Sequence, residues 1–417
     1  MIFANGKLLP DSERKNIIAH LEREINAVRM GPPLEAGTVV AAVDALGKRL
    51  AGGEFDRLLA QFLPPNVTLG DLLPLLTRGA IQVKLAAELG PDPFGDRDFP
   101  KTTARVLPLG TLLHIAPGNM PGLPVYTALE GLLTGNVNLV KLPRGDKGLS
   151  LAAFRLLTEQ EPRLAPYLYG FDLPSGETGP LKGLAALADG VVTWGGEGAV
   201  AAVRAIAPPG CKLIEWGHRL SFAYLSGYED KQAELSALAQ HIVETNQRLC
   251  SSCQVIFLDT ERREEAEAFC GEFLPILESA ARRPGAGARA TLSGYTALLE
   301  RAVEGRSAGE RLYQGRGCSL ILRSDRELEL SPMEGNVLVK CLPQRELFSA
   351  LRREKGRLQT AGLICAPGKR GELTRLLARA GLTRITRAGT LSASFPGEAH
   401  DGEYPLRRYL RVVDVEG

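Results

Sequence analysis

The stretch PLGTLLHIAPGNMPGLPVYTALEGLLTGNVNLVKLPRGD, residues 108–146, decides the fold class of this 417-residue chain. It contains two apolar runs of strand length, 111–116 and 137–142, joined by a glycine- and proline-rich turn and a helix-length segment. The same alternation continues along the chain. The further predicted strands are 190–193, 212–215, 222–225, 254–258, 319–322, 336–341, 362–365 and 384–386. Parallel sheets with crossover helices produce this pattern, so we predict an α/β fold.

The residues before this stretch have the spacing of amphipathic helices. Apolar side chains recur with a helical period in 11–30, in 39–50 and in 55–62, and Pro64-Pro65 ends the third segment. We therefore predict a helical N-terminal region that packs on the body of the protein. At the other end, 400–417 is a turn followed by an alternating run suited to an edge strand, which would pair within the chain or with another subunit.

The overall composition narrows the classes of partner. Fifty Lys and Arg against 48 Asp and Glu give a formal charge of +2, which argues against nucleic acid as a partner. No uninterrupted apolar run reaches the ~18 residues of a membrane span, and the first residues lack the pattern of a secretory signal. Seven cysteines, an odd number, do not make a disulfide framework. We expect a cytoplasmic enzyme of two or three domains without a membrane span.

Polar side chains follow the two strands of the opening stretch. Asn119 lies in the turn after the first strand, and Lys141 and Arg144 lie at the end of the second. In open α/β sheets, ligands bind at the carboxyl ends of the strands, and an arginine fork suits a phosphate. These cations could therefore hold ribose hydroxyls and phosphate. The alternative is that Asn119 supports its turn and that the cations are a solvated strand end.

A second glycine turn occurs in VVTWGGEGA, residues 191–199. Backbone N–H groups at Gly195 and Gly196, between a strand and a helix, could hold a phosphate at the helix N-terminus. The segment lacks the GxGxxG spacing of the usual dinucleotide fingerprint. Taken alone, it is better explained as a simple tight turn.

The segment ETNQRLCSSCQ, residues 244–254, places Cys250 and Cys253 before an apolar strand. A zinc site is disfavoured because no second CxxC or HxxxH follows and none of the five histidines lies nearby in sequence, so we expect no metal. A thioredoxin-like redox pair would lie near the start of a small domain, after its first strand, and these cysteines do not. The remaining functional interpretation is a nucleophilic thiolate. A cysteine can also be a small buried hydrophobe, which is our interpretation of Cys211, Cys270, Cys318, Cys341 and Cys365.

Six segments, taken together and in order, resemble the aldehyde dehydrogenase superfamily, and within it the LuxC-type acyl-CoA reductase branch. They span about six-tenths of the chain, and no single one is decisive. The segments are PLGTLLHIAPGNMPG, GNVNLVKLPRGD, VVTWGG, KLIEWGHRLSFAYLS, NQRLCSSCQVIF and LQTAGLICAP. The resemblance implies a Rossmann-type cofactor domain and an α/β catalytic domain, with the helical region at the N-terminus.

The resemblance also implies roles for three catalytic residues. Cys250, after the Asn246-Gln247 pair, matches the family's nucleophile, and Asn119 matches the asparagine whose amide stabilises the oxyanion. Glu215 falls at the glutamate that activates water in hydrolytic aldehyde dehydrogenases. Cys253 stands where relatives commonly have another residue, so the CxxC departs from the family pattern.

The cofactor-binding residues implied by the resemblance lie at several of the turns described above. They are Pro117, Lys141, Arg144, Gly195, Gly196 and, in the nearest counterpart of the family's downstream cofactor clamp, Glu334. Relatives that use NAD often carry an acidic residue three after the lysine. Here Arg144 stands at that position, which favours a 2′-phosphate, so we predict NADPH, with NADH as the alternative.

The predicted organisation is a cofactor domain with the N-terminal helices in 1–218, a thiol domain in 219–390, and a C-terminal strand in 391–417 that returns to the cofactor domain or to a partner subunit. The predicted reaction is reduction of an acyl-CoA thioester to an aldehyde through an acyl-cysteine. Small and aliphatic residues of the N-terminal helices could line an acyl tunnel, although core packing explains them equally well. The resemblance implies a homodimer or a higher homo-oligomer.

Two other functions use the same residues. One is NAD(P)-dependent oxidation of a free aldehyde, with Glu215 activating water. The other is a non-catalytic or redox-gated binding protein in which Cys250 and Cys253 form a reversible disulfide. Turnover that depends on CoA distinguishes the acyl-CoA reductase from the hydrolytic enzyme, and substitution of each cysteine tests the redox-gated protein.

Overall fold

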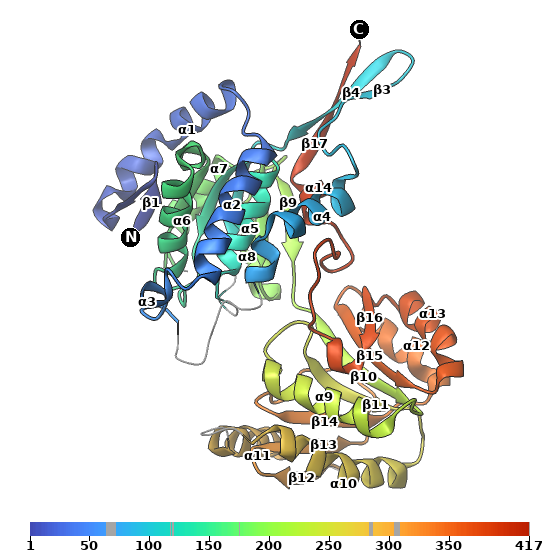
Figure 1. The fold of residues 1–417 in the computed structure, drawn as a ribbon. Coiled ribbons are helices and arrows are strands. Elements are labelled where there is room, and N and C mark those ends of the chain that lie inside the picture. Colours follow the sequence, from blue (N-terminus) through green and yellow to red (C-terminus); the bar gives the residue numbers. More distant parts are fainter. Residues whose placement is uncertain are drawn as a thin grey trace. The chain divides into compact units, whose positions relative to one another are not determined.

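The computed structural model describes residues 1–63, 72–116, 118, 121–174, 176–282, 287–303 and 309–416. This part of the chain divides into two compact units (Figure 1). Unit 1 comprises Met1–Gly217 and Ser394–Gly417, and unit 2 comprises His218–Ala393. In the described ranges, no helix combines the length and the apolar character needed to cross a membrane.

A seven-stranded sheet forms the centre of unit 1. Its order is β2 (Lys7–Leu9), β1 (Ile2–Ala4), β7 (Leu168–Phe171), β6 (Val137–Lys141), β5 (Thr111–Ile115), β8 (Gly190–Trp194) and β9 (Lys212–Trp216). The five strands from β7 to β9 are parallel, and β1 runs antiparallel to β7. The longer helices of the unit are α1 (Arg14–Met30), α2 (Ala36–Ala51), α4 (Arg78–Leu89), α5 (Leu123–Leu133), α6 (Leu149–Gln160), α7 (Thr178–Ala186) and α8 (Glu197–Ile206).

The helical N-terminal region begins with a β-hairpin that was not predicted from the sequence. Ile2, Phe3 and Ala4 of β1 are buried, and the hairpin turns at Asn5 and Gly6, both with positive φ. Each strand has only three residues, which is too short to show a period of two. The Asn-Gly pair is nonetheless a strong hairpin signal, and it could have identified this element.

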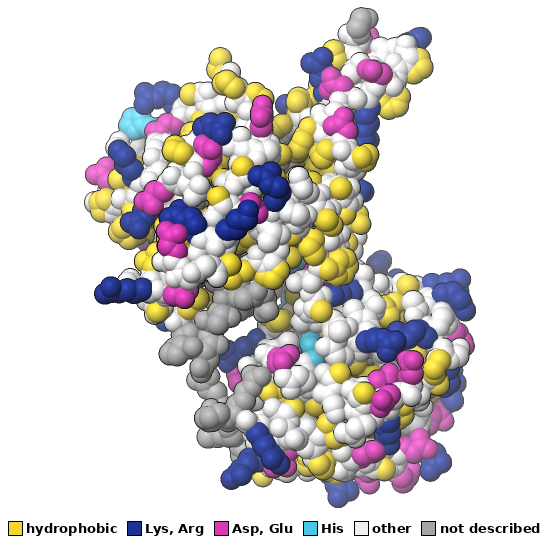
Figure 2. All heavy atoms as spheres, viewed as in Figure 1, with side chains coloured by type: hydrophobic (Ala, Val, Ile, Leu, Met, Phe, Trp, Pro, Cys, Tyr) yellow, Lys and Arg dark blue, Asp and Glu magenta, His cyan; other side chains and the backbone are white. Residues whose placement is uncertain are grey.

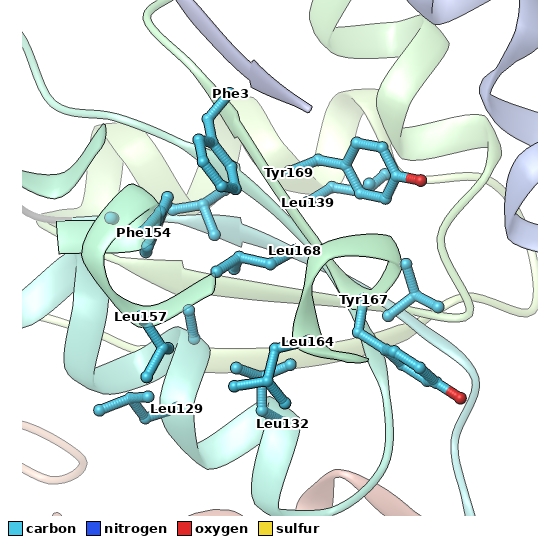
Figure 3. Close-up of a cluster of buried hydrophobic side chains, with 14 of the residues drawn as sticks. Phe3, Leu129, Leu132, Leu139, Phe154, Leu157, Leu164, Tyr167, Leu168 and Tyr169 are labelled. Carbon is cyan, nitrogen blue, oxygen red and sulfur yellow. The ribbon is translucent and has the colours of Figure 1, made fainter. Parts of the chain in front are cut away.

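The core of unit 1 joins this hairpin to the central strands (Figure 3). The rings of Phe3 and Phe154 lie 5.8 Å apart, centroid to centroid, and so connect β1 to α6. Leu139 of β6 and Tyr169 of β7 are fully buried in the same cluster. The helical stripes of α2, α5 and α6 therefore bury their apolar faces against the sheet and one another, as their spacing predicted.

The C-terminal strand belongs to a second, smaller sheet of unit 1. β17 (Leu410–Glu416) pairs antiparallel with β4 (Thr102–Pro108), which pairs in turn with β3 (Arg97–Asp98). β17 is an edge strand, as its alternating sequence suggested. Just before it, the short helix α14 (Pro405–Arg408) is held to α4 because the Leu406 N–H donates to the buried Glu88 carboxylate at 2.8 Å.

Unit 2 has a sheet of its own with helices on both faces. The strand order is β12 (Arg311–Gly315), β13 (Cys318–Arg323), β14 (Asn336–Cys341), β11 (Cys253–Leu258), β10 (Leu220–Ser226), β15 (Leu358–Cys365) and β16 (Arg384–Arg387). All neighbours are parallel except the edge strand β12. One face packs against α9 (Lys231–Thr245) and α10 (Arg263–Ala280), the other against α12 (Gln344–Arg352) and α13 (Arg370–Ala380). The helix α11 (Gly287–Val303) also belongs to this unit.

The α/β prediction is confirmed. Each of the ten strands predicted from the sequence overlaps a strand of the structure, and all ten lie in the two parallel arrays. The predicted helix in 55–62 is shorter than expected, since α3 covers only Asp56–Leu59. The strands that were not predicted are short or amphipathic: β1, β2, β3, β4, β7 and β12.

Candidate functional site

Lys141, Glu215, Gly195 and Gly196 lie at or just after the carboxyl ends of parallel strands in the unit 1 sheet. Lys141 pairs with Ile115, Ile115 pairs with Thr193, and Thr193 pairs with Glu215, so these four residues form one row across β6, β5, β8 and β9. The row lies at the carboxyl ends of the strands. The chain leaves β5 toward β6 on one side and later returns to β8 on the other, which makes this the switch point where open α/β sheets bind ligands.

The two cations differ in their surroundings. Lys141 is 8% exposed, and burial lowers the pKa of its ammonium group, an effect that the nearby Asp172 carboxylate opposes. Arg144 is exposed in the turn that follows. Lys141 is therefore buried at the carboxyl end of β6, whereas the exposed Arg144 can contact a ligand at the protein surface.

The glycine turn after β8 leaves space beside the chain. Gly195 has φ +151°, and a β-carbon there would lie 3.0 Å from the Ala199 β-carbon, so this position needs glycine. A β-carbon on Gly196, the N-cap of α8, would meet nothing within 4 Å. Backbone N–H groups of the first turn of α8 and this open flank fit the pyrophosphate of a nicotinamide dinucleotide. The described residues contain no group of three His, Cys, Asp or Glu side chains that could hold a metal ion.

Glu215 is already bound to a neighbouring cation. Arg204 of α8 donates to both carboxylate oxygens of Glu215, from Nε at 2.6 Å and from Nη2 at 2.7 Å. This pairing holds the pKa of Glu215 below its ordinary value. A general base works best when its pKa approaches the working pH, so Arg204 makes Glu215 a weaker base toward water.

Cys250 lies in unit 2, in the turn between α9 and β11. The helix ends at Thr245, and the next two residues, Asn246 and Gln247, both adopt the left-handed conformation, with φ +46° and +59°. Cys250 is exposed. Cys253, the first residue of β11, is fully buried, and that burial raises the pKa of its thiol to about 12. The two sulfur atoms of the CxxC therefore have opposite environments.

A buried network of amides holds this turn in place. Gln247 donates from Nε2 to Ser331 Oγ at 2.8 Å and to the carbonyls of Cys253 and Asn336, each at 3.1 Å. Its Oε1 accepts from the Gly335 N–H at 3.1 Å. Every polar atom of the fully buried Gln247 amide is thus paired with the start of β11 or the loop before β14. The sequence placed Gln247 beside the cysteine but did not indicate these partners.

The loop before β14 carries Glu334 to the same turn. Met333 and Glu334 are left-handed, with φ +63° and +55°, and the Glu334 N–H donates to the Asn246 carbonyl at 3.2 Å. The Glu334 carboxylate forms an ion pair with Arg248. Glu334 therefore lies against the cysteine turn, with its side chain engaged by a residue of that turn.

Two residues from neighbouring strands contact Cys250 directly. Ser221 Oγ donates to the Cys250 carbonyl at 2.7 Å and accepts from the Thr360 N–H at 3.0 Å. Gln359 Nε2 donates to Cys250 Sγ at 3.2 Å. The β10 strand has a register shift at Ser221 against both of its neighbours, a kind of irregularity that often re-aims side chains near functional sites. Neither contact was predicted from the sequence.

Two predicted site residues, Pro117 and Asn119, lie outside the described residues.

Of the five other cysteines, Cys270, Cys318 and Cys365 are buried, and Cys211 and Cys341 are half-buried. The face drawn in Figure 2 carries acidic and basic side chains intermixed, in keeping with the formal charge of +2.

Unit 1 contains an apolar hollow between its N-terminal helices and α5 and α6. The empty space within it, counted out to the open solvent, is about 800 Å³. From α5 it is lined by Gly122, Val125, Tyr126 and Leu129. The other lining residues are Val43, Leu46, Leu50, Leu58, Leu59, Phe62, Leu72, Leu73, Leu76, Leu149, Ala152, Ala153, Leu156 and Leu157.

Comparison with known proteins identifies relatives over nearly the whole chain. A family model described as acyl-CoA reductase (LuxC) matches residues 33–412. The long-chain acyl-protein thioester reductase of Photorhabdus luminescens is 24% identical, over 98% of this chain and 86% of the relative. The enzyme of the same name from Vibrio harveyi is 24% identical, over 82% of this chain and 72% of the relative.

Solved structures of aldehyde dehydrogenases share the fold. Methylmalonate-semialdehyde dehydrogenase from Oceanimonas doudoroffii superposes with a TM-score of 0.74, covering 99% of this chain and 97% of that one at 14% identity. Aldehyde dehydrogenase C from Pseudomonas syringae, in complex with NAD⁺ and octanal, gives a TM-score of 0.70 with 100% and 96% coverage at 13% identity. The chain therefore belongs to the acyl-CoA reductase (LuxC) family, and it is an oxidoreductase acting on acyl or aldehyde groups, with the aldehyde dehydrogenase fold.

Proposed function

We propose that this protein reduces a long-chain acyl thioester, with acyl-CoA as the donor, to the aldehyde through an acyl–Cys250 intermediate. The observation that carries the proposal is the placement of Cys250. Cys250 is an exposed residue, whereas the turn that bears it is held by the buried Gln247 amide and by Ser221. A nucleophile for acyl transfer needs this combination of an accessible sulfur and a fixed backbone.

The first half of the reaction transfers the acyl group to the protein. The Cys250 thiolate attacks the thioester carbonyl, the C–S bond to the donor breaks, and the donor leaves as a thiol after gaining a proton. Asn119 is our candidate for stabilising the oxyanion, by the resemblance of its turn to the family pattern. Cysteine suits this step because a thiolate is accessible near neutral pH and leaves again readily.

The second half needs a nicotinamide cofactor, for which we propose NADPH. When bound, it supplies the hydride that reduces the acyl group on Cys250 to the aldehyde and releases the thiolate. Lys141 at the sheet edge and the Gly195-Gly196 turn are suited to the ribose and the pyrophosphate. The exposed Arg144, three residues after Lys141, favours the 2′-phosphate that distinguishes NADPH from NADH.

We further propose that the hollow in unit 1 receives the acyl chain. The relatives are named for long-chain acyl groups, and the lining of the hollow is almost entirely aliphatic. Gly122, one of the lining residues, is three residues after Asn119, so part of the lining is close in the chain to the proposed oxyanion residue. From Gly122 to Leu129 it follows α5 for about 10 Å, at 1.5 Å per residue.

Two observations weigh against the other functions considered from the sequence. The ion pair with Arg204 weakens Glu215 as the base that a hydrolytic aldehyde dehydrogenase needs. The complete burial of Cys253 weakens a redox-gated function, because a buried thiol resists ionisation and exchange.

The test is NADPH consumption with acyl-CoAs of increasing chain length, and with an acyl-protein thioester, followed by identification of the aldehyde. We expect aldehyde formation from long-chain acyl-CoA by the wild type and by the control Cys341→Ser, and none by Cys250→Ala. Turnover with the acyl-protein thioester but not with acyl-CoA would show that the acyl donor is a protein thioester. Reduction of NAD(P)⁺ by free aldehydes, without activity on either thioester, would overturn the proposal.

A further inference from the structure

We infer that Gln359 stabilises the thiolate of Cys250 by donating a hydrogen bond to its sulfur. The inference rests on the proposed role of Cys250 as the nucleophile, and it assigns to Gln359 the task of keeping that nucleophile ionised. Gln359 is the second residue of β15, and its sequence position 109 residues after Cys250 carries no sign of the contact.

The contact is short, and it comes from a side chain with little freedom. The distance from Gln359 Nε2 to Cys250 Sγ is 3.2 Å, and Gln359 is 7% exposed. The Gln359 carbonyl accepts from the Thr383 N–H at 3.0 Å and from Thr383 Oγ1 at 3.2 Å, which anchors its backbone to the strand end next to β16. A donor held in this way can face the sulfur without being reordered for each turnover.

A second link joins the same two segments. Ser221 Oγ bridges the Cys250 carbonyl and the N–H of Thr360, the residue after Gln359. The backbone of Cys250 is thus tied to β15 beside the residue that contacts its sulfur. Two hydrogen bonds therefore hold Cys250 against β15: Gln359 contacts its sulfur, and Ser221 contacts its backbone carbonyl.

Other titratable groups around the turn have partners of their own. Arg248 forms an ion pair with Glu334, and the Cys253 N–H donates to His241 Nε2 at 3.4 Å. Burial lowers the pKa of His241 to about 4, so this imidazole is neutral at pH 7. The charged or titratable residues on the segments that lead into β10 and β15 are His218, Arg219, Glu354, Lys355 and Arg357; Arg219 donates to the Gly356 carbonyl and Arg357 pairs with Glu354.

The direction of the amide decides its effect. An N–H donor prefers the sulfur as a thiolate, since the negative charge strengthens the hydrogen bond. If the amide were reversed, its carbonyl oxygen would accept from the S–H group and would favour the neutral thiol. Removing the side chain therefore changes the ionisation of Cys250 in opposite directions for the two orientations, and this makes the inference testable.

The experiment measures the rate at which iodoacetamide alkylates Cys250 as a function of pH, by mass spectrometry of the peptide that contains it. The variants are Gln359→Met, which keeps the length but removes the donor, and Gln359→Glu, which replaces the donor by an acceptor. Gln344→Met is the matched control, because Gln344 makes its side-chain hydrogen bond to Glu372, away from the cysteine turn.

We expect the pH profile of Gln359→Met to move to higher pH, with alkylation about tenfold slower at neutral pH, which is the scale of one charge-assisted hydrogen bond. Gln359→Glu should move it further, and this variant decides the question if Gln359→Met does not fold. Profiles that coincide with the wild type, or that move to lower pH, would overturn the inference. Alkylation needs no substrate, so failure of the proposed acyl reduction would be seen separately, as absence of turnover with an intact profile.

Discussion

At the scale of single residues, the two cysteines of the CxxC have separate tasks. Cys250 is exposed and contacted by Gln359, whereas Cys253 is fully buried and donates weakly to the Val255 carbonyl, with Sγ at 3.5 Å from the oxygen. The spacing of the motif alone left a redox pair open. Burial of one member makes its thiol behave as a small apolar side chain of the core.

Cys253→Ala should therefore lower stability without abolishing activity. Loss of the buried sulfur leaves a small cavity, for which we expect about 1–2 kcal/mol in the free energy of unfolding by urea. Turnover at 25 °C should stay within about twofold of the wild type, while Cys250→Ala should have none. Equal loss of activity in both variants would show that Cys253 takes part in the chemistry.

Glu215 is the second residue whose role depends on its neighbour. In an acyl thioester reductase no water needs activating, so Glu215→Gln should keep aldehyde formation from acyl-CoA. If activity disappears in this variant while the fold is intact by circular dichroism, Glu215 is required for the reaction and the hydrolytic alternative returns.

The difference in stability between Glu215→Gln and the wild type should depend on pH. Arg204 lowers the folded-state pKa of Glu215 below 4.5, so the ion pair contributes stability above pH 4.5 and loses it as the pH falls through the folded value. Glu215→Gln should be slightly less stable than the wild type at pH 7, because Arg204 is largely exposed and solvent weakens the ion pair. Thermal unfolding should show this difference shrinking below pH 4.5. A difference that grows in acid would contradict the assignment.

At the scale of elements, the amphipathic helices of the N-terminal region have two structural roles. They bury their apolar faces in the core, as the periodicity predicted, and α2, α3, α5 and α6 leave the hollow between them. Periodicity marks which residues point inward, but the volume left between helices depends on how closely they approach. The proposal of an acyl site in this hollow makes a prediction about chain length.

Ala153→Phe should shorten the preferred substrate. Ala153 of α6 lines the hollow, and a phenyl ring there would occupy space that a long acyl chain needs. We expect kcat/KM for long-chain acyl-CoA to fall at least ~10-fold, the scale of a few displaced methylenes, with short-chain turnover retained. Ala27→Phe, at an exposed site on α1, is the control. A uniform loss for all chain lengths would place the acyl chain elsewhere.

At the scale of the whole molecule, the C-terminal strand presents an open edge. Within the described ranges, β17 pairs with β4 on one side only, and Val412 and Val415 are 63% and 38% exposed. Exposed valines on an edge strand favour association with another chain, and proteins usually cover such edges or place charged residues on them. We therefore keep the prediction of a homodimer or higher homo-oligomer, with β17 as its contact.

Val412→Glu should weaken that assembly. Light scattering coupled to size-exclusion chromatography should give a dimer or larger species for the wild type and a shift toward the monomer for the variant, because a carboxylate would have to be desolvated at the interface. The control is Glu416→Gln, a conservative substitution at the far end of β17. A wild-type monomer, or an unchanged mass for the variant, would contradict the prediction.

The sequence by itself determined the order of the buried parallel strands and the residues worth examining. Apolar runs of strand length, separated by helical segments, were enough for the two parallel arrays, because burial on both faces leaves a strong local signature. Motif order pointed to the family and to Cys250. The N-terminal hairpin was missed, although Asn5-Gly6 carried its signal, because three-residue strands show no period.

Only the tertiary structure decided the environment of the nucleophile. Gln359 and Cys250 are 109 residues apart, and Gln247 and Ser331 are 84 apart. Such contacts form because β10, β11, β14 and β15 pair side by side, with a register shift at Ser221. Local sequence reports propensity and burial, whereas the register between strands, the desolvation of Cys253 and the ion pair of Glu215 arise only when distant segments meet.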